Sequence, residues 1–277
     1  MKMNTHIEIG NRIFPLDKTS YIMGILNVTP DSFSDGGRHN HVDKALDHAL
    51  RMIDEGADII DIGGESTRPN YTMISEEEEI KRIVPVIEAI RKRTDVPISI
   101  DTYKSKVADV ACMAGANLIN DIWGLRYDSH MAKIVKKHNV ALCIMHNRKA
   151  IDYTDFVSDF HKDINSSLQI ATDAGILNEK IILDPGIGFA KTHEMNLYLL
   201  NHLDMLHDMG YPILLGCSRK SVIGHVLDET VDNRLEGTLA TSVIAVMKGC
   251  QFIRVHDVKE NVRAIRMTEA ILRTSEI

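Results

Sequence analysis

The run Ile22-Met23-Gly24-Ile25-Leu26-Asn27 consists of apolar residues and one glycine, and it ends on an amide. Seven later runs follow the same plan, so that each apolar stretch ends on polar or ionisable side chains. Along the chain these ends are Asp61, Asp101, Asn120 with Asp121, His146 with Asn147, Asp184, Ser218-Arg219-Lys220 and Arg254-Val255-His256. Short apolar runs that alternate with helical patterns are typical of parallel strands joined by crossover helices. Eight such units predict a (β/α)8 TIM barrel whose polar strand ends gather at one rim, where enzymes of this fold have their active sites.

One domain accounts for the whole length of the chain. A barrel of this kind needs roughly 250 residues, and the 277-residue sequence has no low-complexity linker and no break in composition. We therefore expect a single domain over residues 1–277. Residues 6–16 alternate apolar and polar side chains around Gly10-Asn11, which predicts a short N-terminal β-hairpin that closes the bottom of the barrel.

The overall charge favours small-molecule substrates over polymers. The formal net charge is −7 and the isoelectric point is near 6.0, which disfavours a general binder of nucleic acid or of anionic membranes. No stretch approaches the roughly 20 apolar residues of a membrane span. The four cysteines form no CxxC pair, so neither a disulfide framework nor a zinc site is indicated. The first residues lack the apolar segment of a signal peptide, and we expect a cytoplasmic protein.

Two loops after the first and second runs differ from the tight turns elsewhere. Residues 27–41 and 63–69 are rich in small, polar and glycine residues, and the first of them carries Phe33. Such segments at the rim of a barrel are typical of movable lids over a site. An ordinary surface connection is the alternative interpretation.

The chemistry of the other run ends divides into an acidic and a basic group. Asp101, Asn120 and Asp184 suit a heterocycle that is rich in N–H donors, and Phe189 can pack on its face. The last two strands of such barrels often bind phosphate, and here they end in the basic residues Arg219, Lys220, Arg254 and His256. Helix capping by the acids and structural salt bridges of the cations are the simpler alternatives.

Several motifs together resemble those of the dihydropteroate synthases. The segment Met23-Gly24-Ile25-Leu26-Asn27-Val28-Thr29-Pro30-Asp31-Ser32-Phe33-Ser34-Asp35-Gly36-Gly37 is similar to their opening signature, and Gly63-Gly64-Glu65-Ser66-Thr67-Arg68-Pro69 is similar to their second. The match continues in order to Arg254-Val255-His256 and covers about residues 20–273. It departs at Asn70, where glycine is usual, and at Cys143 and Cys217.

The resemblance implies a reaction and a set of residues for it. The family condenses 6-hydroxymethyl-7,8-dihydropterin diphosphate with para-aminobenzoate, and the products are 7,8-dihydropteroate and diphosphate in folate biosynthesis. Sulfonamides compete with the aminobenzoate, and the family is commonly homodimeric. By position, the implied pterin-binding residues are Asp101, Asn120, Met145, Asp184, Phe189 and Lys220. The implied diphosphate-binding residues are Asn27, Arg254 and His256, and Asn27 would also contact Mg²⁺. The implied aminobenzoate-binding residues are Phe33, Thr67, Arg68, Pro69, Lys220 and Ser221.

We expect catalysis to depend on Lys220, Arg254 and His256, which would stabilise the departing diphosphate. Asp35 is our hypothesis for an acid that covers the closed site. No activated Ser–His or Cys–His pair is recognisable in the sequence, and the reaction needs none.

Three alternatives remain open from the sequence. A pterin-binding methyltransferase domain shares the fold and the pterin pocket but has no use for the basic residues at the last two strand ends. A catalytically silent pterin-binding scaffold would be expected to have lost loop residues such as Asn27, Asp35 and Arg68, all of which are present. A zinc hydrolase barrel would need paired histidines on the first strand, which the sequence lacks.

Overall fold

The computed structural model describes residues 5–17, 19–29, 38–65 and 73–274. Its centre is a parallel sheet in the order β8-β7-β6-β5-β4-β3-β10-β9. A bridge between Leu183 and Ile213 joins the two ends of this order, so the sheet closes into a barrel. The strands are β3 (Tyr21–Asn27), β4 (Ile59–Gly63), β5 (Ile98–Asp101), β6 (Leu118–Asp121), β7 (Ala141–Met145), β8 (Ile181–Asp184), β9 (Leu214–Leu215) and β10 (Phe252–Val255). The predicted (β/α)8 barrel is confirmed.

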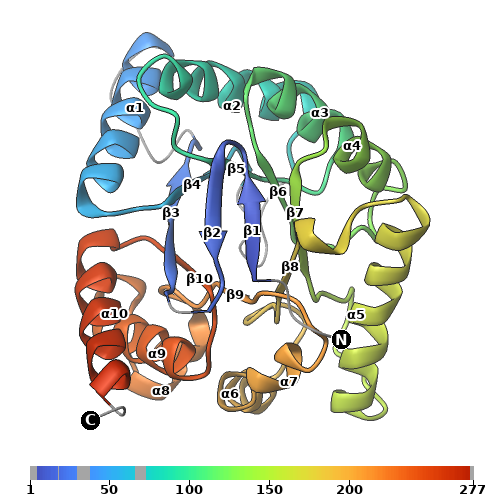
Figure 1. The fold of residues 1–277 in the computed structure, drawn as a ribbon, viewed down its shortest axis with the longest axis vertical. Coiled ribbons are helices and arrows are strands. Elements are labelled where there is room, and N and C mark those ends of the chain that lie inside the picture. Colours follow the sequence, from blue (N-terminus) through green and yellow to red (C-terminus); the bar gives the residue numbers. More distant parts are fainter. Residues whose placement is uncertain (1–4, 18, 30–37, 66–72, 275–277) are drawn as a thin grey trace.

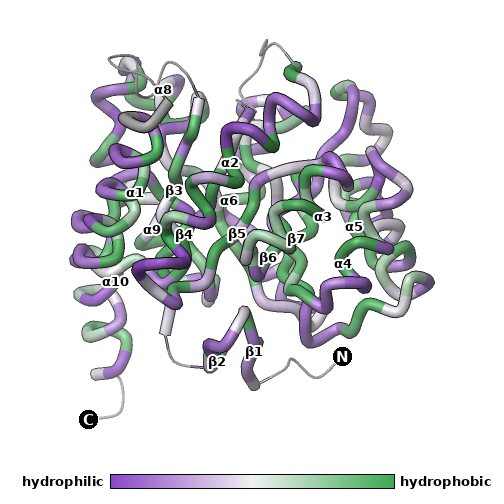
Figure 2. The backbone as a smooth tube through the Cα atoms, turned by 90° about the horizontal axis from the view of Figure 1, so that it is seen from above, coloured by the Kyte–Doolittle hydropathy of each residue, from purple (hydrophilic) through white to green (hydrophobic). Residues whose placement is uncertain are grey.

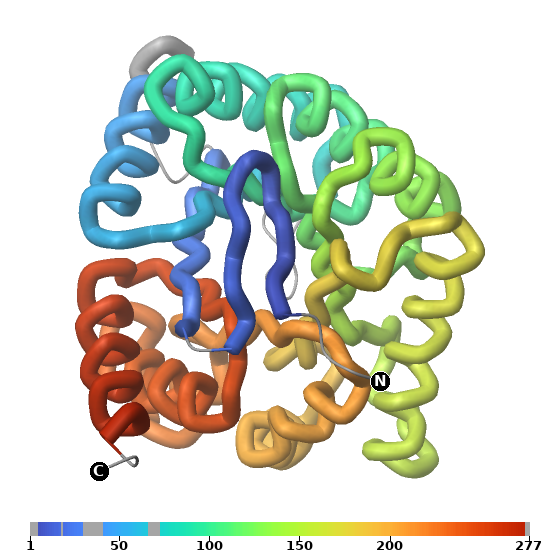
Figure 3. Tube along the Cα trace, in the orientation of Figure 1, coloured from blue at the N-terminus to red at the C-terminus, as the bar shows by residue number. Residues whose placement is uncertain are grey.

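Helices surround the barrel in sequence order, as the colours of Figures 1 and 3 show. In α2 the buried side chains include Ile83, Ile87 and Ile90 at helical spacing, so this helix buries one face. Ser75 caps this helix by accepting a hydrogen bond from the Glu78 backbone. The helices are α1 (Arg38–Glu55), α2 (Glu76–Arg91), α3 (Ser105–Ala114), α4 (Met131–His138), α5 (Phe156–Asp173), α6 (His193–Asn201), α7 (Asp204–His207), α8 (Ser221–Leu227), α9 (Leu235–Met247) and α10 (Val258–Arg273), with the short 3-10 turns η2 (Asn178–Lys180) and η3 (Val231–Asn233).

The N-terminal hairpin lies across one end of the barrel (Figures 1 and 2). Its strands β1 (His6–Ile9) and β2 (Arg12–Pro15) pair in antiparallel register. Ile7, Ile9 and Phe14 are buried in a cluster with residues from the barrel strands, among them Met23 and Phe252. The prediction of a hairpin that closes the bottom is confirmed, because its apolar side chains cover the amino ends of the strands.

The strand register brings polar residues to one level at the opposite end of the barrel. Asn27 pairs with Gly63, Gly63 with Asp101, and Asp101 with Asn120. Farther round, Met145 pairs with Asp184. These positions are the last residues of their strands or lie next to the last, so their side chains are placed at the carboxyl rim.

Candidate active site

Arg254 on β10 links two carboxylates from other strands. Its Nε donates a hydrogen bond to Asp61 Oδ2 at 2.6 Å, and its Nη2 donates to Asp101 Oδ2 at 2.7 Å. The Asn120 amide also donates to Asp61 Oδ2, at 3.4 Å. Asp61, Asp101 and Asn120 are buried. Burial opposes the charge of Arg254, but Asp61 and Asp101 raise its pKa overall, so the guanidinium stays charged.

Asp184 on β8 belongs to the same group of side chains. A β-carbon placed on Gly216 would lie 3.6 Å from Asp184 Oδ2 and 3.8 Å from Arg254 Cδ. Asn27 is placed in the same way on the other side, because a β-carbon on Gly63 would lie 3.6 Å from Asn27 Oδ1 and 3.8 Å from Asp101 Cβ. Each of the two glycines therefore lies beside two of the polar side chains at the rim.

Two carboxylate oxygens of this group have no hydrogen-bond partner within the described residues. They are Asp61 Oδ1 and Asp101 Oδ1, and both are buried. Burial raises the pKa of Asp101 to about 7; the charge of Arg254 opposes this rise and that of Asp61 adds to it. Burial also raises the pKa of Asp184, against the charge of Lys220. Buried acceptors without partners suit a ligand that brings N–H donors.

An apolar wall borders the acidic group. Tyr103, Ile122 and Met145 form a buried cluster, with Trp123 and Phe189 packed against it. The Lys220 ammonium lies 4.5 Å from the centre of the Phe189 ring, a cation–π distance. It also donates a hydrogen bond to the Ile187 carbonyl. Loss of water around Lys220 lowers its pKa, and Asp184 counteracts this. A flat ring between Phe189 and the carboxylates would thus meet an apolar face and a polar edge.

The ends of β9 and β10 come together beside this wall. Ser218 Oγ lies 3.0 Å from His256 Nδ1 and accepts a hydrogen bond from the His256 backbone N–H at 3.2 Å. Arg219 forms a two-point salt bridge with Asp257, at 3.0 Å and 2.5 Å. We expected Arg219 to be a cation for an anionic substrate. The structure instead supports the simpler alternative, in which Arg219 forms a structural salt bridge.

Known proteins resemble this chain over most of its length. A family model described as pterin binding enzyme matches residues 23–256. The dihydropteroate synthase of Clostridium beijerinckii is 57% identical over 268 residues, which cover 96% of this chain and 100% of that protein. The dihydropteroate synthase of Bacillus subtilis is 54% identical over 251 residues, or 91% of this chain and 88% of that one.

The chain belongs to the dihydropteroate synthase family.

Solved structures of the family have the same fold as this chain. The dihydropteroate synthase from Clostridium difficile, crystallised in the presence of pteroic acid, matches with a TM-score of 0.91 and 51% identity, over 94% of this chain and 99% of that chain. The Yersinia pestis enzyme in complex with a sulfonamide drug matches with a TM-score of 0.89 and 43% identity, over 98% of this chain and 100% of that chain. The resemblance found in the sequence motifs is confirmed.

The predicted site residues fall into three groups. The structure brings together at the rim those that lie on strand ends and on the loop after β8. Ser221 is exposed at the start of α8, next to Lys220. Phe33, Asp35, Thr67, Arg68 and Pro69 lie outside the described residues.

Asp61 is a site residue to which the sequence pattern gives no role. The pattern marks it only as the polar end of an apolar run. The available signal was its position inside Ile59-Ile60-Asp61-Ile62, because a carboxylate between buried isoleucines needs a partner. The Arg254 guanidinium is that partner.

His146, by contrast, braces the rim. It is buried, and its Nε2 lies 3.1 Å from Asp163 Oδ2. Burial lowers the pKa of His146 to about 2, and nearby cations including Lys191 add to the shift. A neutral imidazole then donates its Nε2 proton to Asp163 and holds the end of β7 against α5.

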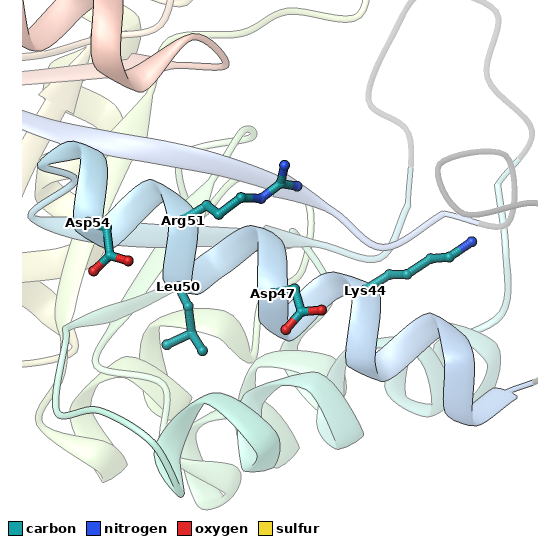
Figure 4. Close-up of a pocket in the computed structure, with 5 residues that line it drawn as sticks. All are labelled: Lys44, Asp47, Leu50, Arg51 and Asp54. Atoms are coloured by element: carbon teal, nitrogen blue, oxygen red, sulfur yellow. The ribbon is translucent and has the colours of Figure 1, made fainter.

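A surface hollow on the outer side of α1 contains none of these groups (Figure 4). It is bordered by two basic and two acidic side chains and one leucine, which are Lys44, Arg51, Asp47, Asp54 and Leu50. The described part of the chain also has no group of three or more His, Cys, Asp or Glu residues that could hold a metal ion. None of its helices is long and apolar enough to cross a membrane.

Proposed function

We propose that the carboxyl rim of this barrel is the active site of a dihydropteroate synthase. The chain is a transferase that condenses 6-hydroxymethyl-7,8-dihydropterin diphosphate with para-aminobenzoate, and it releases 7,8-dihydropteroate and diphosphate in folate biosynthesis. The observation that carries the assignment to this rim is the pair of unpartnered carboxylate oxygens on Asp61 and Asp101, held beside the Arg254 guanidinium.

The pterin ring lies between the acidic group and the apolar wall. Asp101 and Asp184 accept hydrogen bonds from the N–H groups at the amino-substituted edge of the heterocycle, and Asn120 supplies both a donor and an acceptor. Met145 and Phe189 pack on the ring, and the cation of Lys220 lies above the Phe189 face. Desolvated hydrogen bonds of this kind contribute specificity for a ring with matching donors.

The diphosphate lies toward Arg254 and His256. An arylamine is a weak nucleophile, so the rate depends on stabilising the negative charge that grows on the departing diphosphate. Arg254 stays charged between its two carboxylates, and His256 is held by Ser218. Fixed cations and donors need little reorganisation during the reaction, which is how such groups lower a barrier.

Mg²⁺ fits this rim through Asn27. Its amide oxygen lies near Asp101, since a β-carbon on Gly63 would be 3.6 Å from Asn27 Oδ1 and 3.8 Å from Asp101 Cβ. Mg²⁺ typically takes one or two protein oxygens together with substrate phosphates and water. Asn27 would hold the ion, which would supply positive charge to the diphosphate oxygens. In this proposal, the other described residues near Asn27 bind and orient the substrate.

Para-aminobenzoate binds next to the pterin, on the side of Lys220 and Ser221. Phe33, Thr67, Arg68 and Pro69 complete its site, and Asp35 acts as the acid over the closed site. Sulfonamides compete at this position, since they mimic the acid.

The activity is tested by a steady-state assay of para-aminobenzoate incorporation that also measures released diphosphate. We expect equal amounts of dihydropteroate and diphosphate, a strong loss of rate when Mg²⁺ is chelated, and recovery when Mg²⁺ is restored. A methyltransferase would release no diphosphate, and a silent scaffold would bind pterin without product. Either of these results would overturn the proposal.

We also propose that the chain forms a homodimer in the cytoplasm. Helices α6, α8 and α9 contact one another and carry exposed apolar side chains. These are Leu197, Tyr198, Val226, Leu227, Ile244 and Met247. Burial of such a patch in a two-fold interface is the common solution for enzymes. The four free cysteines agree with a reducing compartment. Light scattering during size-exclusion chromatography tests the dimer, and a monomer mass of 31.1 kDa would contradict it.

A further inference from the structure

The loop that follows β8 has an unusual backbone path. Three of its residues have positive φ angles, which are +67° at Gly186, +84° at Gly188 and +44° at Ala190. Residues in this conformation form turns, so the carbonyls of the loop lack the regular partners that a strand or a helix would give them. This loop carries Phe189 and follows Asp184 directly. Its backbone path therefore determines where these two residues lie, and both border the proposed pterin position.

The carbonyls of this loop converge on one buried cation. The Lys191 ammonium donates hydrogen bonds to the Gly186 carbonyl at 2.9 Å, the Phe189 carbonyl at 3.0 Å and the His146 carbonyl at 3.3 Å. Lys191 is only 8% exposed, and an ammonium has three donors, so each of them has an acceptor. The third carbonyl follows the end of β7, and the lysine therefore ties the loop to the neighbouring strand.

The loop and the strand approach each other so closely that only glycine fits at position 186. A β-carbon on Gly186 would lie 2.0 Å from the His146 carbonyl oxygen and 3.2 Å from Lys191 Nζ. Other groups hold the far side of the loop, since the Asn196 side chain accepts from the Gly188 N–H at 2.7 Å. Without the Lys191 ammonium, the carbonyl oxygens of Gly186, Phe189 and His146 would point at one another with no cation between them.

Lys191 also acts on Asp184 through its charge. Burial lowers the pKa of Lys191 to about 7, and Asp184 opposes this shift. In return, the charges of Lys220 and Lys191 oppose the rise in the pKa of Asp184 that burial causes. The lysine thus favours the ionised carboxylate that the pterin N–H groups need.

We propose that Lys191 is a positioning residue for the pterin substrate, which holds Phe189 and the Asp184 carboxylate in their binding geometry without touching the substrate. This inference rests on the proposed function, because it takes the pterin to lie against Asp184 and Phe189. It predicts a selective effect: loss of the three hydrogen bonds weakens pterin binding and leaves aminobenzoate binding unchanged.

The test compares Lys191→Met with Lys191→Arg and with Lys180→Met. Lys180 is a matched control, because its ammonium also donates to a carbonyl, that of Asn139 at 3.1 Å, but at the 3-10 turn that precedes β8. For Lys191→Met we expect the KM of the pterin diphosphate and the dissociation constant of 6-hydroxymethylpterin, measured by calorimetry, to rise about tenfold or more. The KM of para-aminobenzoate should stay constant, Lys191→Arg should recover part of the loss, and Lys180→Met should match the wild type.

The outcomes separate this inference from the proposed function. Equal effects on both substrates, or unchanged pterin binding in a folded Lys191→Met variant, would overturn it. If the methionine variant does not fold, the arginine variant decides, because its planar group cannot satisfy three converging carbonyls equally: we expect selective loss of pterin affinity, and wild-type pterin affinity would contradict the inference. A wild-type chain that neither binds 6-hydroxymethylpterin nor turns over would instead refute the proposed function.

Discussion

The Arg254 guanidinium donates a hydrogen bond to Asp101 Oδ2 at 2.7 Å, although 153 positions separate the two residues in the sequence. This contact crosses the top of the barrel from β10 to β5, with β3 and β4 between them in the sheet. The contact joins the basic part of the rim to its acidic part. The Arg254 guanidinium therefore pairs with the carboxylates and also borders the proposed diphosphate position.

Replacement of Arg254 by methionine should abolish most of the activity. The change removes a cation from the leaving group and leaves Asp61 and Asp101 buried without their counter-ion, a loss of about 3 kcal/mol or more. We expect kcat/KM for the pterin diphosphate to fall about a hundredfold or more. Arg219→Met is the matched control, because Arg219 pairs with Asp257, and its effect should be much smaller. Equal losses in both variants would contradict a specific role for Arg254.

Asp184→Asn and Asp121→Asn should affect different properties. Both carboxylates are buried at strand ends. Asp184 accepts one backbone hydrogen bond, from Gly186 at 2.7 Å, whereas Asp121 accepts two, from Trp123 at 2.9 Å and Leu125 at 2.8 Å. We expect Asp121→Asn to lower the free energy of unfolding by about 1–3 kcal/mol with pterin affinity retained. Asp184→Asn should weaken 6-hydroxymethylpterin binding about tenfold or more. Calorimetry and thermal unfolding of both variants check this, and an Asp184→Asn variant with wild-type affinity would count against pterin binding at Asp184.

Pterin affinity should fall as the pH is lowered through 7. The pKa of Asp101 is raised to about 7 by burial, so the carboxylate that accepts N–H donors becomes protonated below that value. The effect on folding has a defined sign: a raised pKa stabilises the fold at pH values below 3.8, and this contribution is lost as the pH rises through about 7. The stability of the wild type relative to Asp101→Asn should therefore decrease from pH 4 to pH 8. Parallel curves for the two proteins would contradict titration of Asp101 in this range.

Alanine substitutions of two glycines at the rim should affect different properties, one the stability of the fold and the other pterin binding. Gly186→Ala places a β-carbon 2.0 Å from a backbone carbonyl at a φ of +67°, and we expect the unfolding free energy to drop by well over about 1 kcal/mol. Gly216→Ala meets only ordinary contacts, at 3.6–4.0 Å from Asp184 and Arg254. It should fold with an unchanged Tm and bind the pterin more weakly, because its methyl group lies between the two side chains. A wild-type Tm for Gly186→Ala would contradict this prediction, because it would show that the loop accommodates a side chain at position 186 without loss of stability.

The barrel and most of its rim were predictable because strand ends carry their own signal. Each of the eight apolar runs ends on a polar residue, and parallel strands bring such ends to one level. Asp61 was not assigned because its partner Arg254 lies 193 positions away, and no local pattern links the two. The Arg219–Asp257 salt bridge spans 38 positions, so the sequence could offer a structural salt bridge only as an alternative and could not name the partner. The role of Lys191 depends on three positive φ angles that turn carbonyls toward it, a property of the backbone that side-chain patterns do not reveal.

A crystal structure of the chain with bound pterin diphosphate and Mg²⁺ decides whether the rim works as described. We predict that the N–H edge of the ring contacts Asp101 and Asp184, that Phe189 lies on the ring face, and that the diphosphate contacts Arg254 and His256. A ring bound away from the two carboxylates, or a diphosphate that leaves Arg254 and His256 untouched, would contradict the proposed site.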